Sequence, residues 1–239
     1  METFTPIERS IQAQNWTSVI ASIDTKGYAK LPGCIPENQC NDLIRLYDQQ
    51  EHFRKTIVME RYRFGLGEYK YFKYPLPKAI QDMRELIYPN LVTLANKWVA
   101  SLNLGQAFPS SLKELQDICV KNHQVKPTPL LLKYGEGGYN TLHQDLYGSI
   151  YFPLQAVLFL NSPGDDYGGG EFVITEQRPR AQSKATVIQC NKGDILIFTT
   201  NFRPVKGNQR YYKAAMKHGV SEVLYGQRHT LGIIFHDAA

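Results

Sequence analysis

The sequence predicts an α+β protein in which a β-sandwich or jelly-roll barrel is buttressed by N-terminal helices. Two observations indicate this class. In the first half of the 239-residue chain, apolar residues recur at helical spacing, whereas from about residue 126 short strand-like runs alternate with glycine, proline, aspartate and asparagine. The composition, 43% hydrophobic and 21% charged, is that of an ordinary globular protein.

Four segments of the N-terminal half have helical periodicity. The first ends at Gly27, the second has Pro36 in its first turn, and the fourth begins with a serine cap signal. Pro89 lies inside the third segment and is expected to kink or divide it. A short strand and turn, YAKLPGCI, follows the first segment. The four segments are residues 5–27, 36–49, 79–102 and 110–122.

Strand character appears in two parts of the chain. Near residues 58–77, aromatic and charged side chains alternate around a GLG turn, which predicts an aromatic and basic hairpin. Eight later runs with tight turns between them predict the sandwich or barrel, and the helices should support it without forming a free domain. The eight runs are residues 128–134, 140–148, 154–161, 170–177, 185–190, 194–200, 218–226 and 228–237.

The net charge is +5, and its basic residues are concentrated in one segment. Between Arg178 and Lys217, nine basic residues accompany one acidic residue, Asp194, which favours an anionic partner, although a solvated surface has the same composition. No apolar run has the length of a membrane span and no signal peptide is evident, so a cytoplasmic location without a membrane is expected. The cysteines show no zinc spacing and are interpreted as small buried hydrophobes: Cys34, Cys40, Cys119 and Cys190.

A candidate metal site begins with the segment NTLHQDLYG, which places His143 and Asp145 two positions apart. Alternate residues of a strand share a face, but this pair alone is most often structural. His218 is the best third ligand, because it begins another strand-like run and Arg228 follows ten positions later. Two histidines and a carboxylate suit Fe(II) with open positions for substrates and O₂. Arg228 then offers a planar fork for a carboxylate.

The remaining histidines are expected to lie outside this site. His229 neighbours Arg228 on the opposite strand face, so it should point away from the same pocket. His236 is near the terminus, His52 is in a helical segment and His123 is in a loop, which indicates surface or capping positions.

This ordered set of residues resembles the Fe(II)/2-oxoglutarate-dependent dioxygenases, on the prolyl 4-hydroxylase-like side. The resemblance covers residues 126–239 and rests on KYGEGGYNTLHQD, VLFLN, YGGGEFVI, KGDILIFTT and HGVSEVLYGQRHTLGIIF. It implies a double-stranded β-helix, or cupin-like jelly roll, within a single catalytic domain over residues 1–239, with a mainly helical support over residues 1–125. The whole chain, including RFGLGEYKYFKYPLP, is similar to a bacterial branch of oxygenases predicted to be associated with nucleic acid.

The resemblance also implies roles for individual residues. His143, Asp145 and His218 would bind Fe(II), and Arg228 would bind the far carboxylate of 2-oxoglutarate. The implied reaction consumes O₂ and 2-oxoglutarate, releases succinate and CO₂, and hydroxylates or oxidatively demethylates a C–H bond. No catalytic acid or base beyond the metal ligands is expected.

One departure concerns the co-substrate. Relatives often carry a co-substrate tyrosine on the strand AVLFLN, where this sequence has Leu158 and Phe159. Tyr134 matches a tyrosine that lines the co-substrate pocket in relatives, and Thr230 shares a strand face with Arg228. Either residue could supply the missing hydroxyl, although a core aromatic is an equally good interpretation of Tyr134.

The substrate is less constrained than the reaction. In the 58–77 segment, aromatic residues interleaved with cations suit base stacking and phosphate contacts, although an amphipathic hairpin packed on the helices explains them slightly better. The basic segment before His218, interpreted as a loop, is the second candidate surface. A nucleic acid with its target base turned out of the stack fits both. The candidate contacts are Arg61, Tyr62, Arg63, Tyr69, Tyr71, Arg203 and Arg210, with Phe64, Lys70, Lys73 and Tyr74 in the same aromatic and basic pattern.

Three alternatives remain open from the sequence. A protein side chain such as proline is the rival substrate, and a small molecule is also compatible. A jelly-roll binding module without oxidation chemistry is the alternative from another class, although the four filled key positions argue against it. The oligomeric state and the biological process are not predicted by any pattern in the chain.

Overall fold

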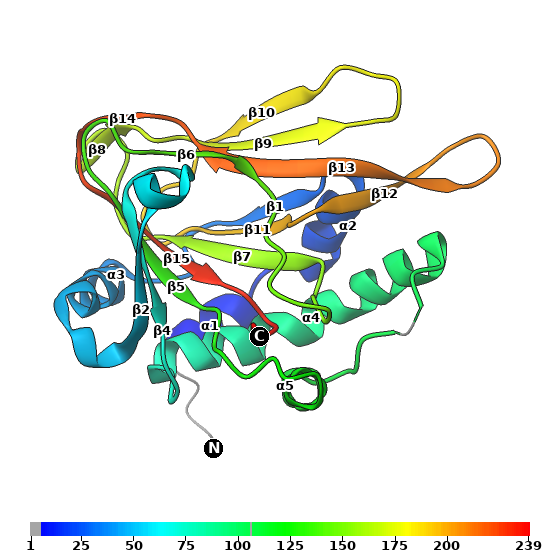
Figure 1. Cartoon of the computed structure of the whole chain (residues 1–239), viewed down its shortest axis with the longest axis horizontal. Coiled ribbons are helices and arrows are strands. Elements are labelled where there is room, and N and C mark those ends of the chain that lie inside the picture. The colour runs from blue at the N-terminus through cyan, green and yellow to red at the C-terminus, as the bar shows by residue number, and fades with distance from the viewer. Residues whose placement is uncertain (1–5, 106) are drawn as a thin grey trace.

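The computed structural model describes residues 6–105 and 107–239, which form two antiparallel sheets backed by helices. The larger sheet has the order β1-β11-β7-β15-β5-β4-β2, and the smaller has the order β10-β9-β13-β6-β3 with β12 paired to β13. This architecture confirms the predicted jelly-roll fold with N-terminal helices (Figure 1). The strands of the larger sheet are β1 (Tyr28–Leu31), β2 (Phe53–Val58), β4 (Glu68–Phe72), β5 (Leu130–Tyr134), β7 (Leu154–Phe159), β11 (Ile195–Thr199) and β15 (Arg228–Ile233). Those of the smaller sheet are β3 (Gly65–Leu66), β6 (Tyr139–His143), β9 (Phe172–Gln177), β10 (Lys184–Ile188), β12 (Phe202–Lys206) and β13 (Tyr211–Val220), while β8 (Tyr167–Gly169) and β14 (Val223–Gly226) form a separate pair.

The helices agree with the predicted segments, with two differences. The first segment is divided near Asn15, whose side chain accepts a hydrogen bond from the Ser18 amide and so begins a second helix. The third is not divided at Pro89, because residues on both sides of the proline are buried against the larger sheet. The helices are α1 (Pro6–Gln12), α2 (Trp16–Lys26), α3 (Glu37–Arg45), α4 (Lys78–Leu102) and α5 (Leu112–Lys121), with three short 3₁₀ turns, η1 (Leu46–Asp48), η2 (Gln50–His52) and η3 (Met59–Tyr62).

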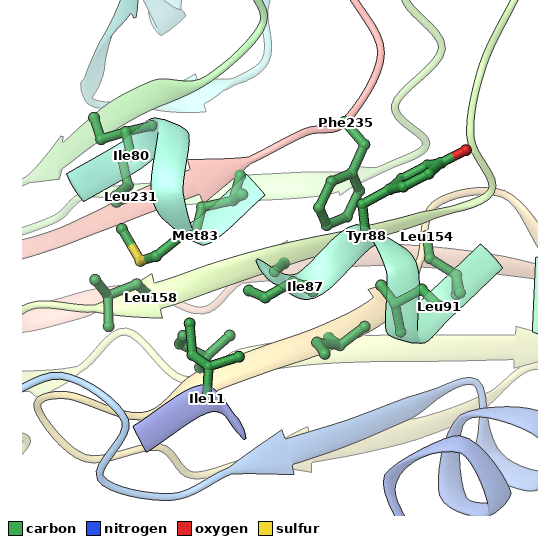
Figure 2. Packing of buried hydrophobic residues seen from close by; sticks show 14 of the residues in the cluster. Ile11, Ile80, Met83, Ile87, Tyr88, Leu91, Leu154, Leu158, Leu231 and Phe235 are labelled. Atoms are coloured by element: carbon green, nitrogen blue, oxygen red, sulfur yellow. The ribbon is translucent and has the colours of Figure 1, made fainter. Parts of the chain in front are cut away.

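The main hydrophobic core lies between α4 and the outer face of the larger sheet. Figure 2 shows Met83, Ile87 and Leu91 of α4 packed over Leu158 and Leu231 of the sheet. All five side chains are fully buried, and each contributes about 1.5–3 kcal/mol of transfer free energy. This helical backing leaves the opposite face of the sheet free to line the interior between the two sheets.

Two segments differ from the predicted strands. The hairpin near residues 58–77 is formed by β2 and β4, and GLG is not its turn, because Gly65 and Leu66 cross over to pair with β6 of the smaller sheet. The basic segment before His218 is a hairpin of β12 and β13, not a loop, and His218 lies near the end of β13 instead of heading a strand. In Figure 1 this hairpin projects beside the β9–β10 hairpin.

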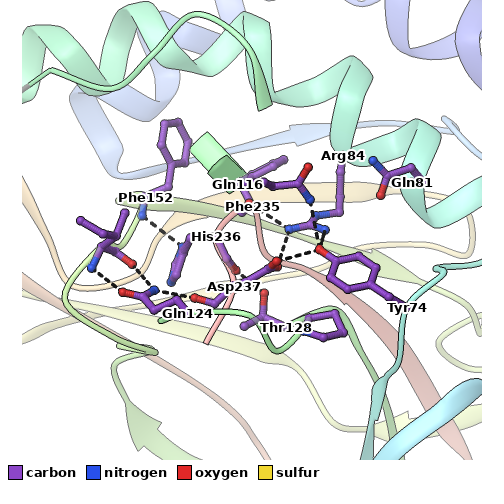
Figure 3. A network of polar contacts seen from close by, with 12 residues as sticks. Tyr74, Gln81, Arg84, Gln116, Gln124, Thr128, Phe152, Phe235, His236 and Asp237 are labelled. Carbon is purple, nitrogen blue, oxygen red and sulfur yellow. Dashed lines mark hydrogen bonds and ion pairs between the residues drawn. The ribbon is translucent and has the colours of Figure 1, made fainter. Parts of the chain in front are cut away.

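A buried polar network ties the C-terminal residues to α4. The Arg84 guanidinium, which is fully buried, lies 3.2 Å from Asp237 Oδ1 and donates to the Phe235 carbonyl at 2.9 Å (Figure 3). The His236 side chain accepts a hydrogen bond from the Phe152 amide and is 1% exposed. The prediction that His236 lies at the surface is therefore wrong, because this network draws the terminus into the core.

The remaining composition-based expectations concern cysteines and membranes. Cys34, Cys40, Cys119 and Cys190 are buried free thiols, which agrees with their interpretation as small hydrophobes. Burial raises the pKa of the Cys34 thiol to about 12, so this thiol stays protonated and unreactive. Within residues 6–105 and 107–239, no helix combines the length and apolar character needed to cross a bilayer.

Candidate metal centre and co-substrate cavity

The three side chains expected to bind a metal come together on adjacent strands of the smaller sheet. His143 ends β6, Asp145 follows two residues later, and His218 lies opposite His143 on β13. Asp145 Oδ1 is 3.6 Å from His143 Nε2, and Asp145 Oδ2 is 3.3 Å from His218 Nε2. The candidate ligand atoms all lie within 4.8 Å of one another. Adjacent ligands bound at about 2.1 Å to one ion are about 3 Å apart, so the residues fit a shared cation.

The protonation pattern of the triad also favours a cation. His143 Nδ1 is 2.7 Å from the Thr141 carbonyl, which can only accept, so Nδ1 carries a proton and Nε2 is the nitrogen that can bind a metal. Burial lowers the pKa of His218, although Asp145 opposes this effect. Burial opposes ionisation of Asp145, yet its interactions with His218 and His143 hold the pKa of this carboxyl well below its usual range. Asp145 therefore stays ionised, and the low pKa of His218 leaves its Nε2 able to release its proton and bind a cation that lies between the two side chains.

Two side chains orient the Asp145 carboxylate. Gln155, on β7 of the larger sheet, donates from Nε2 to Asp145 Oδ2 at 2.8 Å. The Tyr147 hydroxyl donates to Asp145 Oδ1 at 3.2 Å. Each carboxylate oxygen therefore has a donor of its own, which restricts rotation of the group and orients a metal ligand. Neither residue was predicted from the sequence: the contact of Gln155 depends on the packing of one sheet against the other, whereas Tyr147 lies only two residues from Asp145.

A cavity of about 300 Å³ extends from the triad between the two sheets. This volume is at the lower end of the range for small-molecule sites. Its floor consists of inward-facing residues of the larger sheet, with Arg228 beside Tyr134 at one end and Gln155 beside Ile234 at the other. Between these ends the floor is formed by Tyr69, Leu132 and Thr230 in one row and by Tyr71, Leu130, Gly232 and Val157 in the next.

The Arg228 guanidinium marks one end of the cavity as a site for an anion. The side chain is 1% exposed, and its Nε and Nη1 atoms find no acceptor among the described residues. Its Cζ atom lies 5.6, 5.3 and 5.9 Å from the ring centres of Tyr134, Phe159 and Tyr167. A buried cation without a partner is costly, so these free N–H groups fit a carboxylate entering the cavity.

Three hydroxyls lie near this end of the cavity. Tyr134 is paired with Arg228 across β5 and β15, and its hydroxyl accepts a hydrogen bond from Asn140 at 3.4 Å. Thr230 lies two positions along β15 on the same inward face. The Tyr167 ring centre lies 5.9 Å from Arg228 Cζ, and burial raises the pKa of this hydroxyl while the Arg228 charge opposes that rise. Tyr167 follows the turn NSPGDD and is a further candidate for the hydroxyl that Leu158 and Phe159 lack.

The connection between β2 and β4, residues 59–67, spans the opening of the cavity and is called the mouth segment below. The Thr141 amide and hydroxyl both donate to the Phe64 carbonyl at 2.9 Å, which anchors this segment to β6 two residues before His143. Phe64 and Leu146 line the cavity, yet they are 44% and 53% exposed, so they lie at its opening. Tyr62 stacks on Phe64 with ring centres 5.5 Å apart.

The residues predicted to contact substrate separate into three groups. Arg61, Tyr62 and Arg63 are exposed on the mouth segment, while Tyr69 and Tyr71 line the cavity interior. In the same pattern, Lys70 is buried against the Tyr47 carbonyl and Tyr74 donates to Asp237, so neither faces the cavity. The structure thus divides the aromatic and basic pattern between the opening, the interior and the supporting core.

The two arginines predicted in the basic segment occupy different environments. Arg203 is buried, and its Nη2 lies 2.6 Å from Glu176 Oε2, so the prediction that it contacts substrate is wrong. This ion pair links β12 to β9 and satisfies the guanidinium inside the fold. Arg210 is exposed at the end of the β12–β13 hairpin, apart from the residues that line the cavity. His229 is held by Asn161 and does not line the cavity, as expected.

Comparison with protein families identifies related sequences. Residues 67–238 match the profile of a family described as oxygenases catalysing oxidative methylation of damaged DNA. An uncharacterized protein found in two strains of Mycobacterium tuberculosis is 43% identical over 168 residues, which cover 70% of this chain and 72% of that protein.

Solved structures with a similar fold include prolyl hydroxylases. A Pseudomonas putida prolyl-4-hydroxylase matches with a TM-score of 0.55 and 13% identity, covering 91% of this chain and 96% of that one. A Trichoplax adhaerens prolyl hydroxylase, solved with a peptide of hypoxia inducible factor, has a TM-score of 0.53 and 12% identity, covering 97% of this chain and 92% of that one. At these identities the similarity concerns the fold alone.

Proposed function

Because the chain belongs to the nucleic-acid-associated oxygenase family of the Fe(II)/2-oxoglutarate-dependent superfamily, we propose that it is a dioxygenase that hydroxylates a C–H bond of nucleic acid. Hydroxylation of an N-methyl group would lead to oxidative demethylation of the base. The observation that carries this proposal is the arrangement of one cavity: a His143–Asp145–His218 triad on one wall and an unpaired buried arginine, Arg228, at the end of the floor.

Each residue of the site would have a separate role in the proposed reaction. His143 and His218 present neutral nitrogen ligands, and Asp145 adds one negative charge, which leaves part of the coordination sphere open. When bound, Fe(II) supplies activation of O₂ coupled to oxidative decarboxylation of 2-oxoglutarate. Arg228 would bind the far carboxylate of that co-substrate through its free N–H groups. The chain needs no acid or base for the central step.

Apolar packing around the triad would protect the reaction from water. The rings of Phe172 and Phe198 lie 5.8 and 4.6 Å from the ring of His218, and both line the cavity. They are 4% and 1% exposed. A dry wall of this kind strengthens electrostatic interactions in the site and limits side reactions of bound intermediates.

The opening of the cavity supports nucleic acid as the substrate class. Tyr62 and Phe64 present a stacked aromatic pair, and Arg61 and Arg63 flank it as exposed cations. Aromatic faces accept unstacked bases, while neighbouring cations contact phosphates. A base that leaves its stack would pass the mouth segment and enter the interior, which is how enzymes that modify bases reach their target atoms.

The test is substrate-dependent release of succinate from 2-oxoglutarate by the Fe(II)-loaded protein. Single-stranded and duplex oligonucleotides with and without alkylated bases should be compared with peptides and small metabolites. We expect an oligonucleotide to stimulate succinate release above the uncoupled background, and Asp145→Ala to abolish that stimulation. If only peptides or only metabolites stimulate succinate release, the substrate belongs to that class and is not a nucleic acid. No Fe(II)-dependent turnover with any class would favour a binding module.

A further inference from the structure

We propose that the Gln155 end of the cavity is an acceptor-lined subsite, formed with Tyr69, Tyr71 and Tyr147, that binds a planar substrate group through its N–H donors. This inference rests on the proposed function, because it assigns the chemistry of the substrate that enters the same cavity. The chemical class is a neutral heterocycle or amide that carries an amino or imino edge, such as an exocyclic amine of a nucleobase.

The orientation of the Gln155 amide is set by Asp145. An ionised carboxylate can only accept hydrogen bonds, so the NH₂ group of Gln155 must face Asp145 Oδ2, from which it is 2.8 Å away. The Gln155 Oε1 atom then points elsewhere, and it is buried without a donor among the described residues. Gln155 is 6% exposed and lines the cavity. A buried acceptor without a partner is unfavourable, so a donor supplied by a ligand would be favourable.

Three tyrosines line the cavity near Asp145. The Tyr147 hydroxyl donates its only proton to Asp145 Oδ1, so the lone pairs of its oxygen remain able to accept. The ring of Tyr71 is perpendicular to the rings of Tyr69 and Tyr147, with ring centres 5.4 and 6.3 Å apart. Tyr147 therefore adds a second acceptor to Gln155 Oε1, and Tyr69 and Tyr71 supply aromatic walls.

The two ends of the cavity therefore have opposite hydrogen-bond polarity. Arg228 leaves N–H groups free at one end, where they fit an anion. The Gln155 end leaves oxygen lone pairs free and lies against the Asp145 carboxylate, where an anion would be repelled. A co-substrate with two carboxylates and a neutral, donor-bearing substrate would each be directed to its own side of the triad. This polarity keeps the two ligands from competing for one position.

The neighbourhood of the subsite favours a neutral planar group over a cation. The rings of Tyr69 and Tyr71 are perpendicular at 5.4 Å, which gives the interior flat aromatic walls. The Arg54 guanidinium, on β2, lies 4.6 Å from the centre of the Tyr71 ring, so a positive charge is already present beside the subsite. Gly232 on the floor carries no side chain, and a Cβ atom there would lie 3.3 Å from Leu130 Cγ, so the floor is closely packed at this point.

Two matched probes test the subsite directly. Anaerobic titration calorimetry should compare 9-methyladenine with 9-methylpurine, which differ only in the exocyclic amine, on protein loaded with Fe(II) and 2-oxoglutarate. We expect 9-methyladenine to bind about tenfold more tightly, because 9-methylpurine leaves the acceptors unpaired. Gln155→Met should reduce that preference by about threefold or more, since it removes the unpaired oxygen, and the Fe(II) titration of the same variant reports any effect of losing its contact with Asp145. Gln189→Met, an exposed glutamine outside the cavity, is the matched control.

The binding of the two probes tests the acceptor-lined subsite, and a different measurement tests the proposed function. Equal binding of the two probes, or binding of neither, would overturn the acceptor-lined subsite. A preference that survives Gln155→Met unchanged would also overturn it. Fe(II) and 2-oxoglutarate titrations on the same samples report on the triad and on Arg228. Failure of those titrations would overturn the proposed function, whichever probe binds better.

Discussion

His143 and His218 lie directly opposite each other on neighbouring antiparallel strands, with their ring centres 4.2 Å apart. The pairing register of β6 and β13 creates this contact, and a register irregularity follows between His218 and Val220. A one-residue slip of either strand would turn one imidazole to the opposite face of the sheet. The candidate metal site is therefore a direct product of strand pairing in the smaller sheet.

Removal of any triad residue should abolish tight metal binding. His143→Ala or His218→Ala leaves two ligands on a site that needs three, so we expect the affinity for Fe(II) to fall by at least about a hundredfold. Iron content after dialysis, or binding of Co(II) followed by its visible absorption, measures the effect. His52→Ala, which changes a histidine outside the site, should leave the affinity unchanged. Retention of iron by both triad variants would exclude the assigned ligands.

Arg228 should control the affinity for 2-oxoglutarate and leave iron binding intact. Hydrogen bonds to charged groups contribute about 1.5–3 kcal/mol, so Arg228→Ala should weaken 2-oxoglutarate binding roughly 10- to 150-fold. Arg228→Lys keeps the charge but loses the planar fork, and an intermediate affinity is expected. The charge-transfer band of the anaerobic iron complex monitors the titration. Lys133→Ala, on the neighbouring strand β5, is the control. If Arg228→Ala binds 2-oxoglutarate as tightly as the unaltered protein does, another group binds the carboxylate.

The placement of His143, Asp145, His218 and Arg228 in one cavity was predictable because strand alternation is local. Each residue needed only its position within a strand-like run and the order of those runs along the chain. The contact of Gln155 with Asp145 was not predictable in the same way. It joins different sheets, and nothing in the spacing of the chain indicates which side chains meet across the interior.

Two errors in the predicted fold have different physical origins. The β12–β13 hairpin was interpreted as a loop because lysines and arginines recur along the segment, although exposed and buried side chains alternate in β13 from Lys213 to His218. The GLG sequence was interpreted as a turn because glycine is typical of turns. Its glycines serve a different purpose: a Cβ atom at Gly65 would lie 2.2 Å from the Tyr139 carbonyl oxygen, so the close approach of β3 to β6 requires glycine.

Gly65→Ala should destabilise the mouth segment more than an ordinary glycine substitution. Gly65 combines a φ of +138° with that backbone contact, whereas Gly33 has a φ of +58° with open space around it. We expect Gly65→Ala to cost about 2–4 kcal/mol and Gly33→Ala about 1–2 kcal/mol. Urea unfolding measures both values, and Co(II) affinity tests whether the strand that carries His143 is disturbed. Equal costs for the two variants would contradict the role assigned to Gly65.

Stability should fall on acidification because His236 is buried in a neutral form. Burial lowers the pKa of His236 to about 3, below its ordinary value near 6.5. As the pH falls from about 6.5 toward 3, the unfolded chain takes up a proton that the folded chain refuses, so the free energy of unfolding decreases by on the order of 4 kcal/mol. His236→Asn, which can still accept from the Phe152 amide, should show a smaller decrease in urea unfolding between pH 7 and pH 4. His123→Asn, at an exposed position with a φ of +60°, is the control, and identical pH profiles would contradict this assignment.

The mouth segment should bind single-stranded nucleic acid through separable ionic and stacking contributions. Arg61 and Arg63 are exposed cations, so the double variant Arg61→Ala/Arg63→Ala should weaken binding and reduce the slope of log K against log salt by up to about 2. Phe64→Ala should instead lower the affinity by about 1–3 kcal/mol at every salt concentration, because it removes a stacking surface and no charge. Fluorescence anisotropy with a labelled 12-nucleotide strand measures both effects. Lys113→Ala on α5 removes an exposed cation outside the mouth segment, so it should change neither the slope nor the affinity. A salt slope that is the same in the double variant and the unaltered protein would place the phosphate contacts elsewhere, with the exposed lysines of the β12–β13 hairpin as the next surface to test.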